Sequence, residues 1–113
     1  MFVYKVCPAP LWHEAENKGV FAGAAIDFAD GYIHFSTADQ LTETLGKHFA
    51  GQQDLLLIEV DGDRLGASLK WEPSRGGALF PHLYAPLDLI AVTTVAPLLL
   101  DADGRHILPP LPI

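Results

Sequence analysis

Hydrophobic and polar residues follow one another in patterns that predict several short strands and two helices. Residues 2–7 alternate as strand residues do, with Tyr4 and Lys5 on opposite faces. The hydrophobic run at residues 55–60 is broken by Glu59 alone, which is typical of a central strand. By the same criteria, further short strands are expected at residues 32–36, 69–72, 80–84, 89–95, 98–100 and 106–108.

A first helix is predicted over residues 11–18. Pro10 suits the first turn of a helix, and Glu14 and Lys18 have the spacing of an i,i+4 ion pair. Gly19 provides the C-terminal cap. The small residues that follow, up to Asp30, show only a weak pattern and predict a loop.

A second helix is predicted directly after residue 37. Thr37 and Gln40 have the spacing of a capping box. Hydrophobic residues then recur on one stripe of the helix, which is expected to stop at Gly51. Residues 74–78 predict a glycine-rich loop, and the proline-rich residues 109–113 predict a surface tail.

Length and composition limit the chain to one domain over residues 1–113. Half of the 113 residues are hydrophobic, which suffices for one compact core but not for two. Several short strands together with only two short helices predict an α+β fold class. The single cysteine, Cys7, excludes an intramolecular disulfide and is expected to be a buried, unreactive thiol.

The charge balance excludes a nucleic-acid duplex as partner. The net charge is −7, and no two of the seven basic residues are adjacent. A small phosphorylated ligand stays compatible, because one or two well-placed basic groups can hold it. No hydrophobic run approaches the roughly 20 residues of a membrane span. The first residues do not resemble a signal peptide, so a cytoplasmic location is expected.

The first candidate for chemistry is the strand at residues 32–36. Tyr32, His34 and Ser36 fall on the face opposite the core, and the chain then enters the helix capped by Thr37. An imidazole beside a helix N-terminus is suited to hold or protonate an anionic group. The alternative is a solvated strand face on which Ser36 or Thr37 merely caps the helix.

The second candidate is the segment at residues 69–77. Trp71 offers a ring for stacking, Glu72 a base or hydroxyl acceptor, and Arg75 a fork for carboxylate or phosphate. The two glycines that follow allow close approach of a ligand. The alternative is structural: Glu72 and Arg75 pair with each other, and Trp71 belongs to the core.

The third candidate is the strand at residues 80–84, where His82 and Tyr84 share a face. The polar faces of all three segments can line one cleft. Small-molecule sites are commonly built in this way, from several segments of the chain. A transition-metal site formed by His34, Glu72 and His82 is a weaker alternative. The chain lacks His-x-His and Cys-x-x-Cys spacings, so no metal ligands are assigned.

These motifs together resemble a bacterial family of short proteins known as domain of unknown function 952. The resemblance extends over nearly the whole chain. It is carried by Trp12 and Ala15, Asp30-Gly31-Tyr32-Ile33-His34-Phe35-Ser36-Thr37, Gln40, Trp71-Glu72-Pro73-Ser74-Arg75-Gly76-Gly77 and Phe80-Pro81-His82-Leu83-Tyr84.

The stretch from Ile33 through the following helix to Asp61 is also distantly similar to the ADP-ribosyltransferase-like superfamily. This similarity implies a small split antiparallel β-sheet with two short helices and a nucleotide cleft. The implied chemistry is NAD-dependent transfer through an oxocarbenium-like transition state, in which a carboxylate holds the ribose. Glu72 is assigned this role, because the late strands carry no acidic residue with a matching motif.

The leading hypothesis is therefore a pocket for a nucleotide or for an NAD- or ADP-ribose-like ligand, with possible glycosyl-transfer chemistry. The expected catalytic or acid–base groups are Glu72, His34 and His82. The expected ligand-binding residues are Arg75, Ser36, Thr37, Trp71 and Tyr84. The alternatives are a non-catalytic binding module and a metal-assisted hydrolase. A monomer or weak dimer is expected, with a small molecule as partner.

Overall fold

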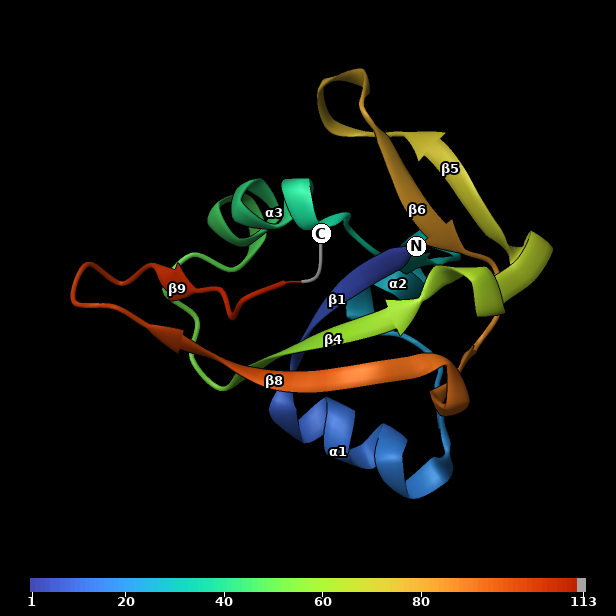
Figure 1. The fold of residues 1–113 in the computed structure, drawn as a ribbon, viewed down its shortest axis with the longest axis horizontal. Coiled ribbons are helices and arrows are strands. Elements are labelled where there is room, and N and C mark those ends of the chain that lie inside the picture. The colour runs from blue at the N-terminus through green and yellow to red at the C-terminus, as the bar shows by residue number, and fades with distance from the viewer. Residues whose placement is uncertain (112–113) are drawn as a thin grey trace.

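The computed structural model describes residues 1–111 and shows a curled antiparallel sheet with a few short helices (Figure 1). The α-helices are α1 (Ala9–Lys18), α2 (Ala25–Asp30) and α3 (Leu41–His48). The strands are β1 (Phe2–Pro8), β2 (Val20–Phe21), β3 (Ile33–His34), β4 (Leu55–Asp61), β5 (Leu69–Pro73), β6 (Leu79–Leu83), β7 (Leu87–Asp88), β8 (Val92–Leu100) and β9 (His106–Ile107). Short 3-10 helices connect them: η1 (Ala38–Gln40), η2 (Gly62–Ser68), η3 (Arg75–Gly77) and η4 (Leu89–Ala91).

Two larger groups of strands form the curled sheet, and β2 and β7 form a separate antiparallel pair. The larger has the order β1-β4-β8-β9, and its central member β4 confirms the strand predicted from the hydrophobic run. The smaller has the order β3-β6-β5. They meet at a bridge where Tyr4 and Ser36 exchange two backbone hydrogen bonds of 2.8 and 2.9 Å. This bridge places the segment after β3 beside β1, where the cavity described below lies.

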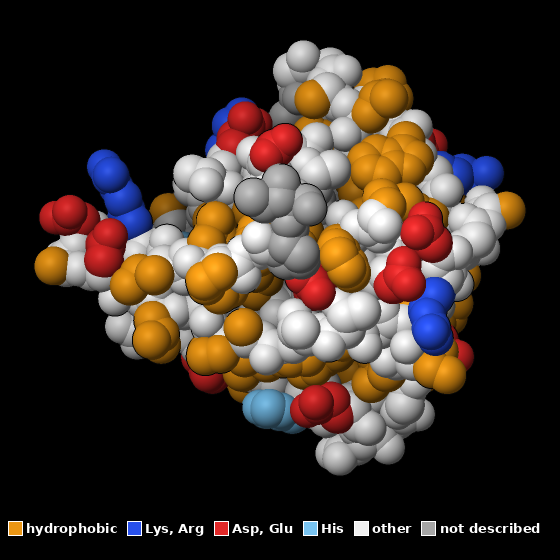
Figure 2. Space-filling view, in the orientation of Figure 1, with side chains coloured by type: hydrophobic (Ala, Val, Ile, Leu, Met, Phe, Trp, Pro, Cys, Tyr) orange, Lys and Arg blue, Asp and Glu red, His pale blue; other side chains and the backbone are white. Residues whose placement is uncertain are grey.

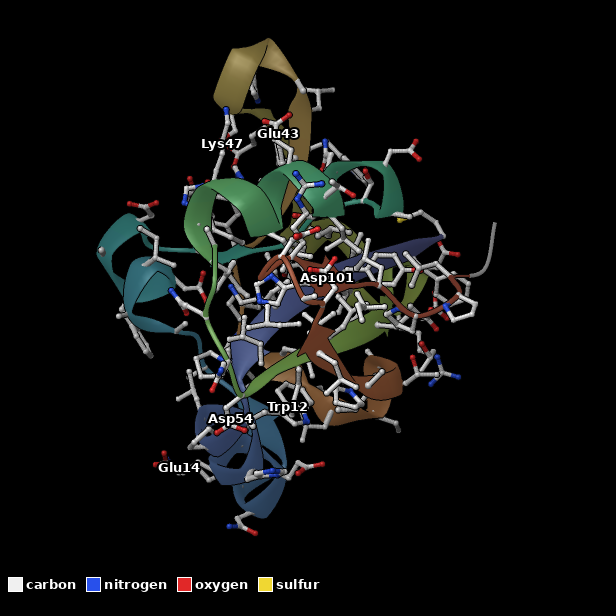
Figure 3. The ribbon with its side chains drawn as sticks, turned by 90° about the vertical axis from the view of Figure 1, so that its left-hand side faces the viewer. Trp12, Glu14, Glu43, Lys47, Asp54 and Asp101 are labelled. Atoms are coloured by element: carbon white, nitrogen blue, oxygen red, sulfur yellow. The ribbon has the colours of Figure 1, made fainter. Side chains whose placement is uncertain are left out.

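Helix α1 covers one face of the larger group of strands. Its Trp12 packs with Val3 of β1 and Ile58 of β4, all of them buried. Figure 3 shows Trp12 on the side of α1 toward the sheet and Glu14 on the side away from it. The predicted features of this helix are confirmed, because Glu14 pairs with Lys18 at 3.7 Å and Gly19 caps the end with φ 78°.

Helix α3 covers the opposite face. Its Leu41 and Leu45 pack against a second set of buried residues that includes Tyr4 and Leu57. Strand alternation explains the division, because neighbouring residues of β1 and β4 point to opposite faces. The predicted second helix begins as η1, where Gln40 accepts the N–H of Thr37 at 3.0 Å. Helix α3 ends at His48, three residues before the predicted stop.

Two sequence-based expectations are wrong. The segment at residues 19–30 is not a loop throughout, since it contains β2 and the helix α2, which was not predicted. A six-residue helix shows too little periodicity to be recognised, and its stability comes from tertiary contacts. The strand expected at residues 89–95 begins only at Val92, because Asp88 accepts the N–H of Ile90 at 3.0 Å and starts η4 instead.

The hairpin of β8 and β9 extends from one end of the molecule (Figure 1) and carries charged side chains at its turn (Figure 2). The strands predicted at residues 98–100 and 106–108 pair with each other, with Leu99 opposite Ile107 and Gly104 in the turn at φ 79°. Among residues 1–111, no helix has the length and apolar character that crossing a bilayer requires. The tail predicted for residues 109–113 lies partly outside the described residues.

Candidate functional site

A cavity of about 420 Å³ lies between β1, the β3–β6 pair and α3. Three consecutive residues of β1, Tyr4 to Val6, line it, as expected for a cavity along the edge of a strand rather than over one face. The other aromatic lining residues are Tyr32, Phe35, Phe49 and Phe80. The remaining lining residues are Ile26, Asp30, His34, Ser36, Thr44, His48, Ser74 and His82. The cavity thus combines ring-bearing walls with a few polar groups.

His34 and His82 are brought together by the pairing of β3 with β6. The two residues are direct partners in the register, and their ring centroids lie 5.5 Å apart. Tyr32 lies against both imidazoles, stacked on His82 at 4.1 Å and tilted toward His34 at 4.6 Å. The three rings form one continuous polar and aromatic wall of the cavity.

Two carboxylates hold the ring of His34. Its Nδ1 lies 2.6 Å from Asp27 Oδ1, and its Nε2 lies 2.8 Å from Asp30 Oδ2. Ionised carboxylates only accept hydrogen bonds, and a neutral imidazole has one N–H. Both contacts are therefore satisfied as hydrogen bonds when His34 is an imidazolium.

Asp27 is the buried anchor of this arrangement. Its carboxylate accepts from Lys5 Nζ at 2.9 Å, from the Ala24 N–H at 2.7 Å and from the backbone and ring of His34. The side chains of Lys5 and Asp27 are only 5% and 1% exposed. Burial alone would raise the pKa of Asp27, but the hydrogen bond from His34 and the charge of Lys5 lower it to about 2.

A second carboxylate–imidazole pair lies beside the first. Glu72 Oε1 is 2.9 Å from His82 Nδ1 and accepts a 2.6 Å hydrogen bond from the Tyr84 hydroxyl. These two bonds hold the pKa of Glu72 below its ordinary value. The same contact raises the pKa of Tyr84 to about 12. His82 is only 3% exposed. Its ring is held by the hydrogen bond with Glu72 and by stacking on Tyr32.

Hydroxyl groups complete the polar lining on the side of α3. Ser36 Oγ and Thr44 Oγ1 form a 2.9 Å hydrogen bond. The Tyr4 hydroxyl donates to Glu59 at 3.2 Å, and burial together with the Glu59 carboxylate raises its pKa to about 12. Tyr4 therefore stays a neutral donor at any ordinary pH.

The structure brings together only part of the predicted site. His34, Ser36 and His82 line the cavity, Glu72 contacts His82, and the Tyr84 hydroxyl donates to Glu72. Trp71 does not join them: it is paired with Pro81 and lies on the opposite face of β5 from Glu72. Thr37 serves the start of η1. The side chain of Arg75 lies outside what the structure describes.

Sequence reasoning missed Lys5, Asp27 and Asp30 as parts of the site. Lys5 was placed on a strand face where a lysine has no obvious partner, and Asp27 falls in a helix that was not predicted. One signal was available for Asp30, because it lies four residues before His34 at the Asp-Gly turn. Strand alternation would likewise have separated Trp71 from Glu72.

The metal alternative finds no ligand set in this geometry. Within residues 1–111, no three His, Cys, Asp or Glu side chains are arranged to share an ion. His34 and His82 each direct one ring nitrogen to a carboxylate that is engaged elsewhere.

Comparison with known proteins gives one family and one close structural relative. The model of the family described as "Protein of unknown function (DUF952)" matches residues 6–95. The crystal structure of protein CC0527 from Caulobacter crescentus has 48% sequence identity and a TM-score of 0.91, over 95% of this chain and 94% of that one. The solution NMR structure of CC0527 has 50% identity and a TM-score of 0.83, over 92% and 90%. None of the curated proteins matches this chain.

Proposed function

The chain belongs to the DUF952 family of proteins of unknown function, and from its cavity we propose that it binds a small, ring-bearing molecule the size of a nucleoside or mononucleotide. One observation carries this proposal. Two imidazoles from paired strands turn toward one cavity of about 420 Å³ that aromatic rings line. Ligand pockets commonly measure about 300–1,000 Å³ and combine apolar walls with a few oriented polar groups.

The chemistry of the lining supports a ligand with a flat ring and a polar end. Phe49 and Phe80 offer apolar ring surfaces. His34, Ser36 and Thr44 offer hydrogen-bonding groups. Because His34 and His82 are fixed by carboxylates, their orientation is set before a ligand arrives, which lowers the entropy lost on binding.

Glycosyl transfer from NAD is the second candidate, as the resemblance to the ADP-ribosyltransferase-like superfamily implies. The carboxylate proposed for the ribose from sequence, Glu72, is not among the residues that line the cavity. Asp30 is, and it lies beside His34. A carboxylate next to an imidazole can stabilise an oxocarbenium-like centre, so this candidate depends on Asp30. For either candidate function, we propose that the protein works in the cytoplasm as a monomer or weak dimer.

Thermal unfolding with added ligand tests the proposal. AMP, ADP-ribose, NAD and zinc are added separately to the wild-type protein. Ligand at a hundred times its dissociation constant stabilises the folded state by about 2.7 kcal/mol. Stabilisation by AMP or ADP-ribose supports the binding site, and release of nicotinamide from NAD would add the transfer reaction.

A matched pair of variants assigns the effect to the cavity. Ser36→Ala changes a lining hydroxyl, while Thr93→Ala changes a hydroxyl on β8 that does not line the cavity. The stabilisation by ligand is expected to fall in the first variant and to stay in the second. Equal responses of both variants, or stabilisation by zinc that a chelator reverses, would contradict the proposal.

A further inference from the structure

We propose that the cavity is specific for an organic anion, whose anionic group displaces the carboxylate of Asp30 from His34 when it binds. This inference rests on the proposed small-molecule site and adds the class of its ligand. It also assigns Asp30 a role as an internal competitor. The two carboxylates that contact His34, those of Asp27 and Asp30, hold it in unequal ways.

Asp27 and Asp30 differ in how firmly they are held. Asp27 is buried and accepts hydrogen bonds from Lys5, Ala24 and His34. The Asp30 side chain is 42% exposed, and its carboxylate lies 2.8 Å from His34 Nε2. Partly exposed ion pairs of this kind contribute little to stability, so Asp30 can leave at small cost while Asp27 stays.

The position of Asp30 in α2 also favours its departure. It is the last residue of the helix, where the unsatisfied carbonyl groups make a negative charge unfavourable. Gly31 follows with φ 85°, a conformation that ends the helix directly behind it. The bond to His34 is thus the contact that keeps the carboxylate of Asp30 at the cavity.

The charges around His34 leave an anion-binding group once Asp30 turns away. When His34 is an imidazolium, its charge and that of the Lys5 ammonium then face one buried carboxylate, that of Asp27. The carboxylate of Glu72, beside the neighbouring imidazole, is bound to His82 and Tyr84. His34 Nε2–H would then point into the cavity as an uncompensated donor, which a carboxylate or phosphate satisfies with a charge-assisted hydrogen bond.

Binding of one-ring probes to the full chain tests this assignment. Benzoate and phenyl phosphate carry the two kinds of anionic group, benzamide is neutral, and benzylammonium is a cation of similar size. Nitrogen-15 NMR of the imidazoles follows His34, and the ring signals of Phe49 follow occupancy of the cavity. We expect benzoate or phenyl phosphate to shift His34 Nε2 and to bind at least tenfold more tightly than benzamide. Whichever of the two anions binds more tightly indicates whether the ligand's anionic group is a carboxylate or a phosphate.

The variant Asp30→Asn provides the second arm. It removes the competing charge, so the affinity for the anionic probe is expected to rise roughly two- to fivefold. Asp39→Asn is the control, because it removes an exposed carboxylate in η1 that does not line the cavity. Its affinity for the probe is expected to equal that of the wild type.

Three results would overturn the inference. Tighter binding of benzamide or benzylammonium with shifts of Phe49 would show that the cavity binds small molecules without preferring anions. A loss of anion affinity in Asp30→Asn would show that Asp30 helps to hold the ligand. If neither the wild type nor Asp30→Asn bound any of the four probes, the proposed binding function would be overturned as well.

Discussion

The ammonium of Lys5 lies 2.9 Å from the carboxylate of Asp27, and both side chains are buried between β1 and α2. This pair connects the first strand of the larger strand group to the short helix that carries Asp30. Asp27 also holds His34 through ring and backbone. The pair is therefore a structural support of the site, and its removal is expected to affect stability before it affects binding.

Replacing Asp27 by asparagine is expected to lower the free energy of unfolding by about 3–5 kcal/mol, because it leaves the Lys5 ammonium buried without a counter-charge. Urea denaturation at neutral pH measures this effect. Asp103→Asn, which changes an exposed carboxylate in the β8–β9 turn, is the control and should stay within about 0.5 kcal/mol of the wild type. A small effect of the first variant would mean that Lys5 finds water or another partner.

The same residue predicts a dependence of stability on pH. The pKa of Asp27 is lowered from 3.8 to about 2, so the unfolded chain takes up this proton before the folded one. The stabilisation is complete above about pH 4 and is lost as the pH falls through about 2, amounting to about 2 kcal/mol. Urea midpoints between these pH values should fall more steeply for the wild type than for Asp27→Asn. Parallel curves would contradict the assigned pKa.

The local patterns of the sequence explain how much of this could be foreseen. Strand β4 was predictable because five of the six residues at 55–60 are hydrophobic, and the start of the second helix was predictable from the spacing of Thr37 and Gln40. The convergence of His34 and His82 was inferred because each lies on the polar face of a short strand. These patterns can be read from the sequence because they involve residues that are close together in the chain.

Asp27 shows what could not be foreseen. Its partners are Lys5, 22 residues earlier, and His34, seven residues later, and the three residues belong to three different elements, β1, α2 and β3. A buried carboxylate is stable only when the fold delivers its donors, so the tertiary structure decides its role. The third helix was missed for the same reason, since Asp27 is its only buried residue.

Tyr84 is expected to report the charge of Glu72. The wild-type pKa of about 12 results chiefly from the 2.6 Å hydrogen bond to that carboxylate. In Glu72→Gln the acceptor is neutral, so the pKa should return toward 10.0. Carbon-13 NMR of labelled tyrosine at about pH 11 should show ionised Tyr84 in the variant and neutral Tyr84 in the wild type. Tyr84→Phe identifies the signal, and an unchanged titration would exclude the contact.

Ile33 is expected to be a core residue although it adjoins His34. It is buried in the cluster around Trp12, opposite the polar face of β3. Ile33→Ala should therefore cost about 2–5 kcal/mol of unfolding free energy through lost burial and a residual cavity. Ile90→Ala removes the same atoms from a side chain that is 73% exposed, and should change stability by less than about 0.5 kcal/mol. Similar losses in both would contradict the burial of Ile33.

Trp71 was predicted to bind the ligand, but it does not line the cavity. Both Trp71 and Glu72 were expected in the pocket, but successive residues of β5 face opposite sides, and the indole is 41% exposed beside Pro81. Trp71→Ala should therefore leave the affinity for AMP or benzoate within about twofold of the wild type. Phe80→Leu removes a ring that lines the cavity and should weaken binding about three- to tenfold, the range of one aromatic contact. Isothermal titration calorimetry compares the two variants after denaturation has shown both to be folded. If Trp71→Ala instead lost affinity while Phe80→Leu retained it, the ligand would bind on the outer face of β5 and the cavity between β1 and α3 would have another role.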